Sequence, residues 1–147
     1  MLEKAQVWIY SKTDSAINSR QYKVLLLKLV ADRGGFWQPV TGHIEAGEEL
    51  EKGAFRETFE ETGLKPLHQM VPLDFKFTFQ GKWGVAHETA FAMEVEPGCP
   101  EPIIDPNEHT EFRWVEILEA SQMLAHRSNQ EALELLIGRL IPAPSHE

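Results

Sequence analysis

This sequence has one cysteine, few basic residues and no long apolar run. Cys99 has no second cysteine with which to pair, which excludes an internal disulfide framework and favours a reducing compartment. No segment approaches the roughly 20 apolar residues of a membrane-spanning helix. Residues 1–12, MLEKAQVWIYSK, do not have the pattern of a signal peptide. We therefore expect a cytoplasmic protein that does not engage membranes.

The shortage of basic residues also limits the choice of partners. The chain carries 14 lysines and arginines against 23 aspartates and glutamates, a formal net charge of −9. Such a charge repels polyanions, so we expect no nucleic-acid partner. If the substrate is itself a small anion, a cation must mediate its binding, and a divalent metal is the first candidate.

Length and composition fit one globular domain. The chain has 147 residues, of which 42% are hydrophobic and 25% are charged, as in ordinary folded domains. The sequence contains no repeat, low-complexity segment or plausible linker. We predict a single domain over residues 1–141, followed by a tail over 142–147.

Hydrophobic periodicity predicts a chain of strands and helices. Residues 74–79, DFKFTF, alternate strictly, and a turn at 80–84 leads to a partner strand. Ser128 and Glu131 have capping-box spacing at the start of the last helix. The predicted strands cover 5–10, 23–30, 74–79, 86–95 and 111–116, and the predicted helices cover 48–61, 117–124 and 128–140. This order predicts a mixed fold class, α/β or α+β.

The helix predicted over 48–61 carries the most informative pattern. Glu57 lies three and four residues before Glu60 and Glu61, so the three carboxylates share one face. Like charges at that spacing destabilise a helix by roughly 0.2–0.5 kcal/mol per pair. Either a bound cation offsets the repulsion, or the face is a solvated acidic surface. The three carboxylates alone do not choose between these interpretations.

Other positions of this helix predict how it packs. Leu50, Ala54 and Phe55 can point inward, and Thr58 and Phe59 lie roughly a turn further on. Gly53 costs about 1 kcal/mol of helix propensity relative to alanine, which indicates a close contact at that position. Gly63 is placed to end the helix in a left-handed conformation.

The residues around the carboxylates favour a cation. Residues 42–64 read GHIEAGEELEKGAFRETFEETGL and resemble the Nudix box, the signature of hydrolases that split a diphosphate linked to another moiety. Thr58 fills a position that is usually aliphatic, a mild departure. The matching positions are Gly42, Glu48, Arg56, Glu57, Glu60, Glu61, Gly63 and Leu64. The resemblance implies the Nudix fold, an α/β/α sandwich with a mixed central sheet.

The same resemblance implies a metal site. Mg²⁺ prefers oxygen ligands, and Mn²⁺ is the alternative ion. Bound between carboxylates and phosphate oxygens, such an ion neutralises charge and acidifies water. Glu57 is implied to lie closest to the attacking water, and Glu48 to orient Arg56, which holds the ligands in place. The implied ligands are the Gly42 carbonyl and the carboxylates of Glu57, Glu60 and Glu61.

The catalytic base of enzymes that resemble this one can lie on a loop well after the box. Glu108 precedes a predicted strand and is our candidate, with Glu111 close behind it. Asp105, next to Pro106, is a weaker candidate. For each of these residues, plain surface charge is the competing interpretation.

The box specifies diphosphate chemistry but not the group that the diphosphate carries. Residues 36–48, 107–120 and 128–133 are similar to bacterial dihydroneopterin triphosphate pyrophosphatases, which release pyrophosphate from a pterin triphosphate and also accept nucleoside triphosphates. The alternative is a nucleoside diphosphate sugar such as ADP-ribose or GDP-mannose. The proline typical of ADP-ribose enzymes is replaced here by Phe79 and Gln80. A non-catalytic nucleotide sensor is disfavoured, because no box carboxylate is missing.

Residues outside the box are candidates for holding this small nucleotide-type substrate. Two basic residues can meet phosphates, two tryptophans offer ring faces, and two further side chains offer polar edges. These candidates are Lys28 and Arg33, Trp37 and Trp83, and Gln38 and His87. For the tryptophans, a place in the core is the competing interpretation. Many enzymes of the family are dimers, and an exposed N-terminal hairpin over 5–10 and 23–30 is a candidate homodimer interface.

Overall fold

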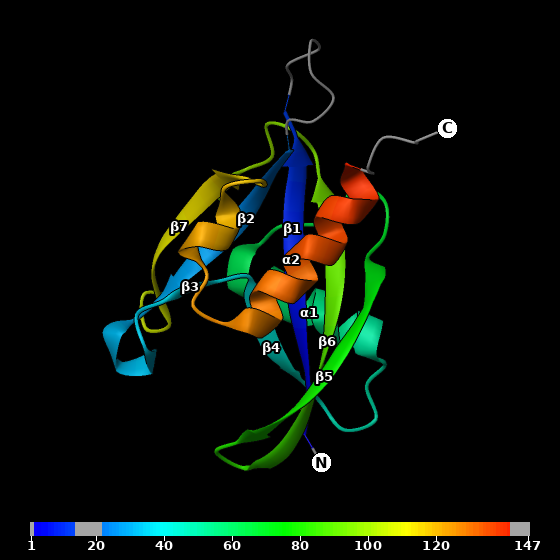
Figure 1. The fold of residues 1–147 in the computed structure, drawn as a ribbon, viewed down its shortest axis with the longest axis vertical. Coiled ribbons are helices and arrows are strands. Elements are labelled where there is room, and N and C mark those ends of the chain that lie inside the picture. The colour runs from blue at the N-terminus through cyan, green and yellow to red at the C-terminus, as the bar shows by residue number, and fades with distance from the viewer. Residues whose placement is uncertain (1, 14–21, 142–147) are drawn as a thin grey trace.

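The computed structural model describes residues 2–13 and 22–141, and the tail predicted over 142–147 lies outside them. Seven strands of these residues form one sheet (Figure 1). The strands are β1 Leu2–Lys12, β2 Tyr22–Leu29, β3 Trp37–Gln38, β4 Val40–Ile44, β5 Val71–Gly81, β6 Gly84–Val95 and β7 His109–Glu116. The helices are α1 Leu50–Thr62, α2 Arg127–Leu140 and the 3₁₀ turns η1 Ala31–Arg33 and η2 Ala120–Met123. None of the helices in the described residues is long and apolar enough to cross a membrane.

The sheet is mixed, as predicted. β1 pairs in parallel with β6 and antiparallel with β2 and β4. β2 also pairs antiparallel with β3 and β7, and β5 pairs antiparallel with β6. The strand order is β3-β2-β1-β6-β5, with β4 beside β1 and β7 beside β2. All five predicted strands are present, whereas the short strands β3 and β4 were not predicted.

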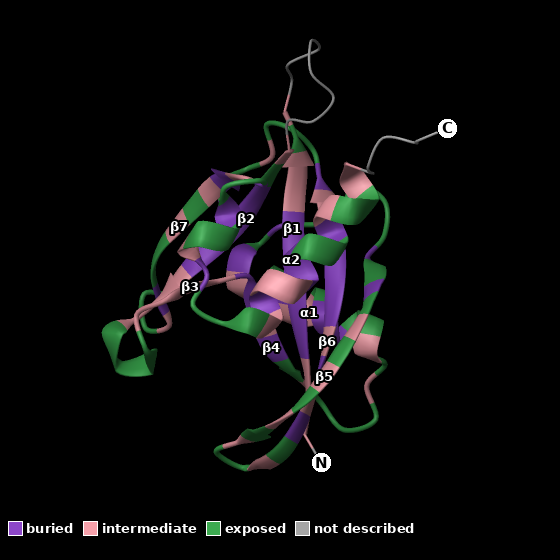
Figure 2. Ribbon diagram, viewed as in Figure 1, coloured by how far each residue is buried: buried purple, intermediate pink, exposed green. Residues whose placement is uncertain are grey.

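The two α-helices cover opposite faces of this sheet. Figure 1 shows α2 in front of the strands and α1 behind them. Because side chains alternate along a strand, Trp8 of β1 packs in the core beneath α2, while Val7 and Ile9 pack in the core beneath α1. Figure 2 shows the buried central strands between the two helices. The expected α/β/α sandwich is confirmed.

The predicted N-terminal hairpin is not exposed. β1 and β2 do pair with each other, through Tyr10 and Val24 among others. Each strand also pairs with further strands, and their side chains Trp8, Ile9 and Val24 are 0% exposed. The two strands are therefore central to the sheet, and the prediction of an exposed hairpin is wrong.

Helix α1 differs from its prediction in its ends and in its packing. It begins two residues later and ends one residue later than predicted. Ala54 is buried as predicted, but Phe55 is 37% exposed, so the prediction of an inward Phe55 is wrong. A turn further on, Phe59 is 44% exposed but Thr58 is buried, and the hydroxyl of Thr58 donates to the carbonyl oxygen of Ala54 over 2.8 Å. This local hydrogen bond allows a threonine to be buried there.

The C-terminal elements correct two further predictions. α2 begins at Arg127, and its N-cap residue, His126, makes no side-chain capping hydrogen bond. The predicted capping box of Ser128 and Glu131 is therefore wrong, since Ser128 lies inside the helix. Glu131 instead accepts a hydrogen bond from Arg127 over 3.0 Å. Of the helix predicted over 117–124, only the short turn η2 is helical.

Candidate active site

Packing of α1 on β4 brings two parts of the box together. Gly42 of β4 lies against Glu57 of α1, so that a Cβ atom on Gly42 would lie 2.5 Å from Cγ and 2.7 Å from Oε2 of Glu57. No side chain fits at such distances, so this approach of strand and carboxylate requires glycine. The Glu57 side chain is 19% exposed.

Replacing Gly42 with alanine should therefore displace Glu57 and lower turnover by about 10- to 100-fold, because misplacement by about 1 Å is costly in an active site. Gly138 of α2 is the matched control, since a Cβ atom there would meet nothing within 4 Å. Gly138→Ala should keep full turnover and stabilise the protein by about 0.5–1 kcal/mol. Steady-state assays and thermal unfolding measure both effects. Wild-type turnover in Gly42→Ala would contradict the prediction.

Arg56 of α1 ties together the acidic residues around it. Its guanidinium donates to both oxygens of Glu48, from Nε over 2.8 Å and from Nη2 over 3.0 Å. Nη1 donates to Glu57 and to Glu60, each over 3.2 Å, and Nη2 also donates to the carbonyl oxygen of His43 over 3.1 Å. The hydrogen bond from Arg56 lowers the pKa of Glu48 to about 2, and the bond to Glu48 raises the pKa of Arg56.

Gly53 makes room for this arrangement. A Cβ atom on Gly53 would lie 2.7 Å from Oε1 of Glu48 and 2.8 Å from Cδ1 of Ile44. The same Oε1 atom accepts a hydrogen bond from the backbone N–H of Glu45 over 2.9 Å. The close contact predicted from a glycine inside the helix is confirmed.

Glu61 is in the most unusual environment of the three predicted carboxylates. Its Oε2 atom is buried and has no hydrogen-bond partner among the described residues. Burial raises the pKa of Glu61 to about 8, helped by the charges of Glu108, Glu57 and Glu60 and opposed by that of Arg33. An unpartnered buried carboxylate is costly to a folded protein. A cation bound at this face would remove that cost.

Glu108 reaches the same acidic face from a distant part of the chain. Its carbonyl oxygen accepts a hydrogen bond from the backbone N–H of Val30 over 2.9 Å, which joins the turn before β7 to the start of η1. Its side chain lies 3.6 Å from the guanidinium of Arg33. Burial raises the pKa of Glu57, and the charge of Glu108 adds to this rise as it does for Glu61. Glu108 and Arg33 are thus electrostatically coupled to the carboxylates of α1.

The two other candidate bases are placed differently. Glu111 on β7 lies 3.8 Å from Lys28 and 3.8 Å from Arg113. Asp105 accepts a hydrogen bond from the backbone N–H of Asn107 over 2.9 Å and so shapes the turn. None of these contacts involves the carboxylates of α1.

The donor set suits a hard divalent cation. Mg²⁺ takes oxygen ligands, and Glu61 offers a buried oxygen without a partner. Gly42 leaves space in which the Glu57 carboxylate approaches the strand. Within residues 2–13 and 22–141, no three Asp, Glu, His or Cys side chains already converge as a metal-ligand group. The residues fit the ion by their chemistry, and the ligand set stays a prediction.

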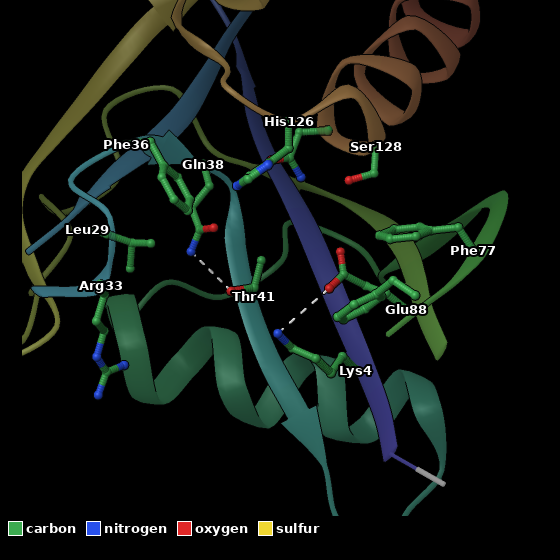
Figure 3. A pocket seen from close by; sticks show the side chains of 12 residues that line it. Lys4, Leu29, Arg33, Phe36, Gln38, Thr41, Phe77, Glu88, His126 and Ser128 are labelled. Carbon is green, nitrogen blue, oxygen red and sulfur yellow. Dashed lines mark hydrogen bonds and ion pairs between the residues drawn. The ribbon is translucent and has the colours of Figure 1, made fainter. Parts of the chain in front are cut away.

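A cavity of about 390 Å³ shares Arg33 with this region, although none of the three carboxylates of α1 lines it (Figure 3). Two predicted substrate contacts line it, Arg33 and Gln38, and Gln38 donates to the hydroxyl of Thr41 over 3.2 Å. Figure 3 shows Arg33 beside helix α1, apart from Lys4 and Glu88. The other lining residues include Lys4, Phe36, Phe77, Glu88, His126 and Asn129. Arg33 therefore links the cavity to Glu108 and the acidic face.

The other four predicted substrate contacts do not line this cavity. The ring of Trp37 has Lys28 Nζ 6.0 Å and Arg113 Cζ 4.9 Å from its centroid. His87 of β6 hydrogen-bonds a threonine of β5. Trp83, in the turn between these strands, is 77% exposed. A role for these four residues in substrate binding stays a prediction.

The sequence prediction missed the residues at the inner end of the cavity. Glu88 of β6 is 5% exposed and Asn129 of α2 is 4% exposed. The available signal was Glu88 itself, a charged residue in the otherwise largely apolar strand AHETAFAMEV. No local pattern connects it with Asn129.

The chain is similar to known proteins in both sequence and fold. The family model described as NUDIX domain matches residues 12–136. The dihydroneopterin triphosphate diphosphatase of Haemophilus influenzae is 33% identical over 125 residues, covering 76% of this chain and 77% of that protein. An octanoyltransferase of Myxococcus xanthus is 36% identical over 117 residues, covering 76% of this chain and 31% of that protein. The chain spans about a third of the length of that transferase, so the match does not carry octanoyl transfer to this protein.

Solved structures share the fold along nearly the whole chain. A NUDIX hydrolase structure from Listeria monocytogenes superposes with a TM-score of 0.78 at 29% identity, covering 93% of this chain and 92% of that one. The Ap4A hydrolase of C. elegans gives a TM-score of 0.77 at 20% identity, covering 95% of this chain and 98% of that one. At 20% identity, the second likeness concerns the fold alone.

Proposed function

Because this chain belongs to the Nudix family of hydrolases, we propose that it is a Mg²⁺-dependent pyrophosphohydrolase of nucleotide-type triphosphates. Water would attack a phosphoanhydride phosphorus, giving a monophosphate and pyrophosphate. One observation carries this proposal above the others. Glu61 has a buried, unpartnered Oε2 atom on the helix face that it shares with Glu57 and Glu60, and its carboxylate is coupled electrostatically to Arg33, which lines the cavity.

The box residues have distinct roles in this proposal. A divalent cation held by the carboxylates of Glu57, Glu60 and Glu61 and the Gly42 carbonyl would neutralise phosphate charge and acidify a water molecule. Arg56 keeps the first two carboxylates in position through its hydrogen bonds.

Residues outside the box complete the proposed site. Glu108 lies beside the acidic face and would accept the proton of the attacking water. Arg33, 3.6 Å from Glu108, carries the planar fork of donors that suits phosphate oxygens. Since Arg33 also lines the cavity, the phosphates would lie at this end and the attached group further in.

The similarity to the Haemophilus influenzae enzyme supports a triphosphate substrate. That relative matches over about three quarters of both chains, and its name states its action on dihydroneopterin triphosphate. The stretches 36–48 and 107–120 contribute Gln38 to the cavity and Glu108 to the acidic face. A pterin or nucleoside triphosphate is therefore the substrate class that we propose.

Replacing Arg56 with lysine tests the positioning role. Lysine keeps the charge but cannot donate to Glu48, Glu57 and Glu60 with a rigid fork. The Mg²⁺ concentration for half-maximal activity should rise about 10- to 100-fold, with kcat largely recovered at saturating Mg²⁺. Arg127→Lys is the control, because that side chain is 88% exposed and pairs with Glu131 on α2. An unchanged Mg²⁺ dependence in Arg56→Lys would refute the role.

Product analysis tests the proposed reaction directly. The purified chain would be incubated with Mg²⁺ and, side by side, dihydroneopterin triphosphate, the common nucleoside triphosphates, ADP-ribose and GDP-mannose. We expect turnover of triphosphates with release of pyrophosphate. Release of a nucleoside monophosphate and a sugar phosphate would make the protein a nucleotide-sugar hydrolase. No turnover with Mg²⁺ or Mn²⁺ would favour a sensor.

A further inference from the structure

The inner end of the cavity is built from buried polar side chains that the proposed reaction does not use. Gln6 of β1 is 0% exposed, Glu88 of β6 is 5% exposed and Asn129 of α2 is 4% exposed. Glu88 and Asn129 line the cavity, and Gln6 lies behind them. Buried polar groups normally have at least one hydrogen-bond partner, so an unpartnered one in a residue that lines a cavity is a candidate for contact with a ligand.

Hydrogen bonds fix how the amide groups of Gln6 and Asn129 are turned. Trp8 Nε1 donates to Oε1 of Gln6 over 2.8 Å, and Asn129 Nδ2 donates to the same oxygen over 3.3 Å. Gln6 therefore turns its amide N–H₂ toward Glu88, and it donates to Oε2 of Glu88 over 2.9 Å. Asn129 is left with its Oδ1 buried and without a partner in the described part of the chain. Asn129 Oδ1 is therefore an unsatisfied hydrogen-bond acceptor.

Glu88 supplies a second acceptor, and Lys4 a donor beside it. Oε1 of Glu88 lies 4.0 Å from Nζ of Lys4, which is an ion pair but too long for a hydrogen bond (Figure 3). Burial raises the pKa of Glu88, whereas Lys4 and Gln6 favour its ionised form. Glu88 is linked to Asn129 through Gln6 on one side and to Lys4 on the other. In this order, Asn129 Oδ1 is an acceptor, Glu88 Oε1 is a second acceptor and Lys4 Nζ is a donor.

Aromatic rings line the space in front of these groups. Phe36 packs edge-on against His126, with ring centroids 4.4 Å apart and an interplanar angle of 88°. Phe77 and Phe79 lie with centroids 5.5 Å apart on β5, and Figure 3 shows Phe77 on the other side of the view from Phe36. Flat rings stack favourably on such side chains. The cavity therefore suits a planar heterocycle whose polar edge meets Glu88.

We propose that this inner end binds the 2-amino-4-oxo edge shared by guanine and by pterins. That edge presents an amino donor, a ring N–H donor and a carbonyl acceptor, which complement Asn129 Oδ1, Glu88 Oε1 and Lys4 Nζ in that order. Adenine presents a ring nitrogen acceptor where guanine has N–H, so it would oppose the Glu88 carboxylate. The proposal rests on the proposed function for the position of the phosphates, but ring recognition itself can be measured without hydrolysis.

Calorimetric binding of monophosphates to the full chain tests the proposal. We expect GMP and dihydroneopterin monophosphate to bind at least about tenfold more tightly than AMP, because a site with buried acceptors rejects a ring that lacks the donors. IMP, which lacks the 2-amino group, should lie between GMP and AMP. Tighter binding of GMP would indicate a guanine nucleotide as the ligand, and tighter binding of dihydroneopterin monophosphate would indicate a pterin.

Glu88→Gln makes the test specific. Gln6 would still donate to the new amide oxygen, which leaves the amide N–H₂ facing the cavity. This donor opposes the ring N–H of guanine but suits the ring nitrogen of adenine, so GMP binding should fall about tenfold and AMP binding should not. Glu94→Gln neutralises another carboxylate of β6 that does not line the cavity, and it should leave both affinities unchanged.

Asn129→Ala provides an independent variant, and serves alone if Glu88→Gln does not fold. Loss of Oδ1 should remove the preference for GMP over IMP, since only the amino group distinguishes the two rings. Equal binding of GMP and AMP by the wild type, equal weakening of both by Glu88→Gln, or no binding of any of these ligands would overturn the proposal. Selective GMP binding without turnover would instead refute the hydrolysis and keep the ring site.

Discussion

Replacing Glu61 with glutamine should nearly abolish turnover and at the same time stabilise the metal-free protein. The variant lacks one charged oxygen ligand of the proposed cation, so kcat should fall on the order of a thousandfold. Glu57→Gln should have a similar effect on kcat for the same reason. Glutamine is close to glutamate in shape, so neither substitution should disturb the packing of α1 on β4.

The gain in stability follows from the raised pKa of Glu61. Its pKa rises from the ordinary 4.5 to about 8 in the folded protein, chiefly through burial. Between these two pH values the unfolded chain has lost the proton that the folded chain keeps, so the free energy of unfolding decreases as the pH rises. Glutamine does not titrate, so the free energy of unfolding of the variant does not decrease in this way. Above pH 8 the variant should be more stable than the wild type by on the order of 2–4 kcal/mol.

Denaturant unfolding with a chelator present, at several pH values between 4.5 and 9, measures this effect. The stability difference between variant and wild type should grow across the window and then level off. Glu51→Gln is a suitable control, because it neutralises an exposed carboxylate in the first turn of the same helix. Mg²⁺ should stabilise the wild type more at pH 8 than at pH 6, since it competes with the proton on Glu61. A Glu61→Gln protein with near-normal turnover would exclude Glu61 as a ligand.

Replacing Glu108 with glutamine should slow the chemical step by about a hundredfold, the usual contribution of a general base. Mg²⁺ binding should change little, because Glu108 is not among the proposed ligands. The two effects separate in a Mg²⁺ titration of single-turnover rates. The plateau rate should fall while the midpoint stays within about threefold of the wild type.

Glu111→Gln is the matched comparison for this prediction. Glu111 follows Glu108 closely in sequence but pairs with Lys28 and Arg113 on the sheet. Its variant should keep the wild-type plateau rate. If Glu108→Gln keeps that rate and Glu111→Gln loses it, the base is Glu111. If both keep it, the base lies within the box.

Much of the fold and part of the site follow from local spacing. The alternation in 74–79 and 86–95 predicts two strands, and both are present in β5 and β6. The helical spacing of Glu57, Glu60 and Glu61 alone places the three residues on one face of the helix. The glycine inside the helix correctly indicates a close contact, because its cost in helix propensity requires a compensating reason. Each inference concerns residues within a few positions of one another, where backbone geometry fixes the relation.

Long-range packing established the rest. Local spacing did not show that Phe55 and Phe59 stay exposed, or that Arg33 and Glu108 meet beside Glu61. The cavity likewise joins Lys4, Glu88 and Asn129 from three elements far apart in the chain. The burial of a side chain depends on which distant residues pack against it, and the pKa shift of Glu61 depends on that burial. No pattern within a single segment carries this information, because both quantities are sums over contacts with distant residues.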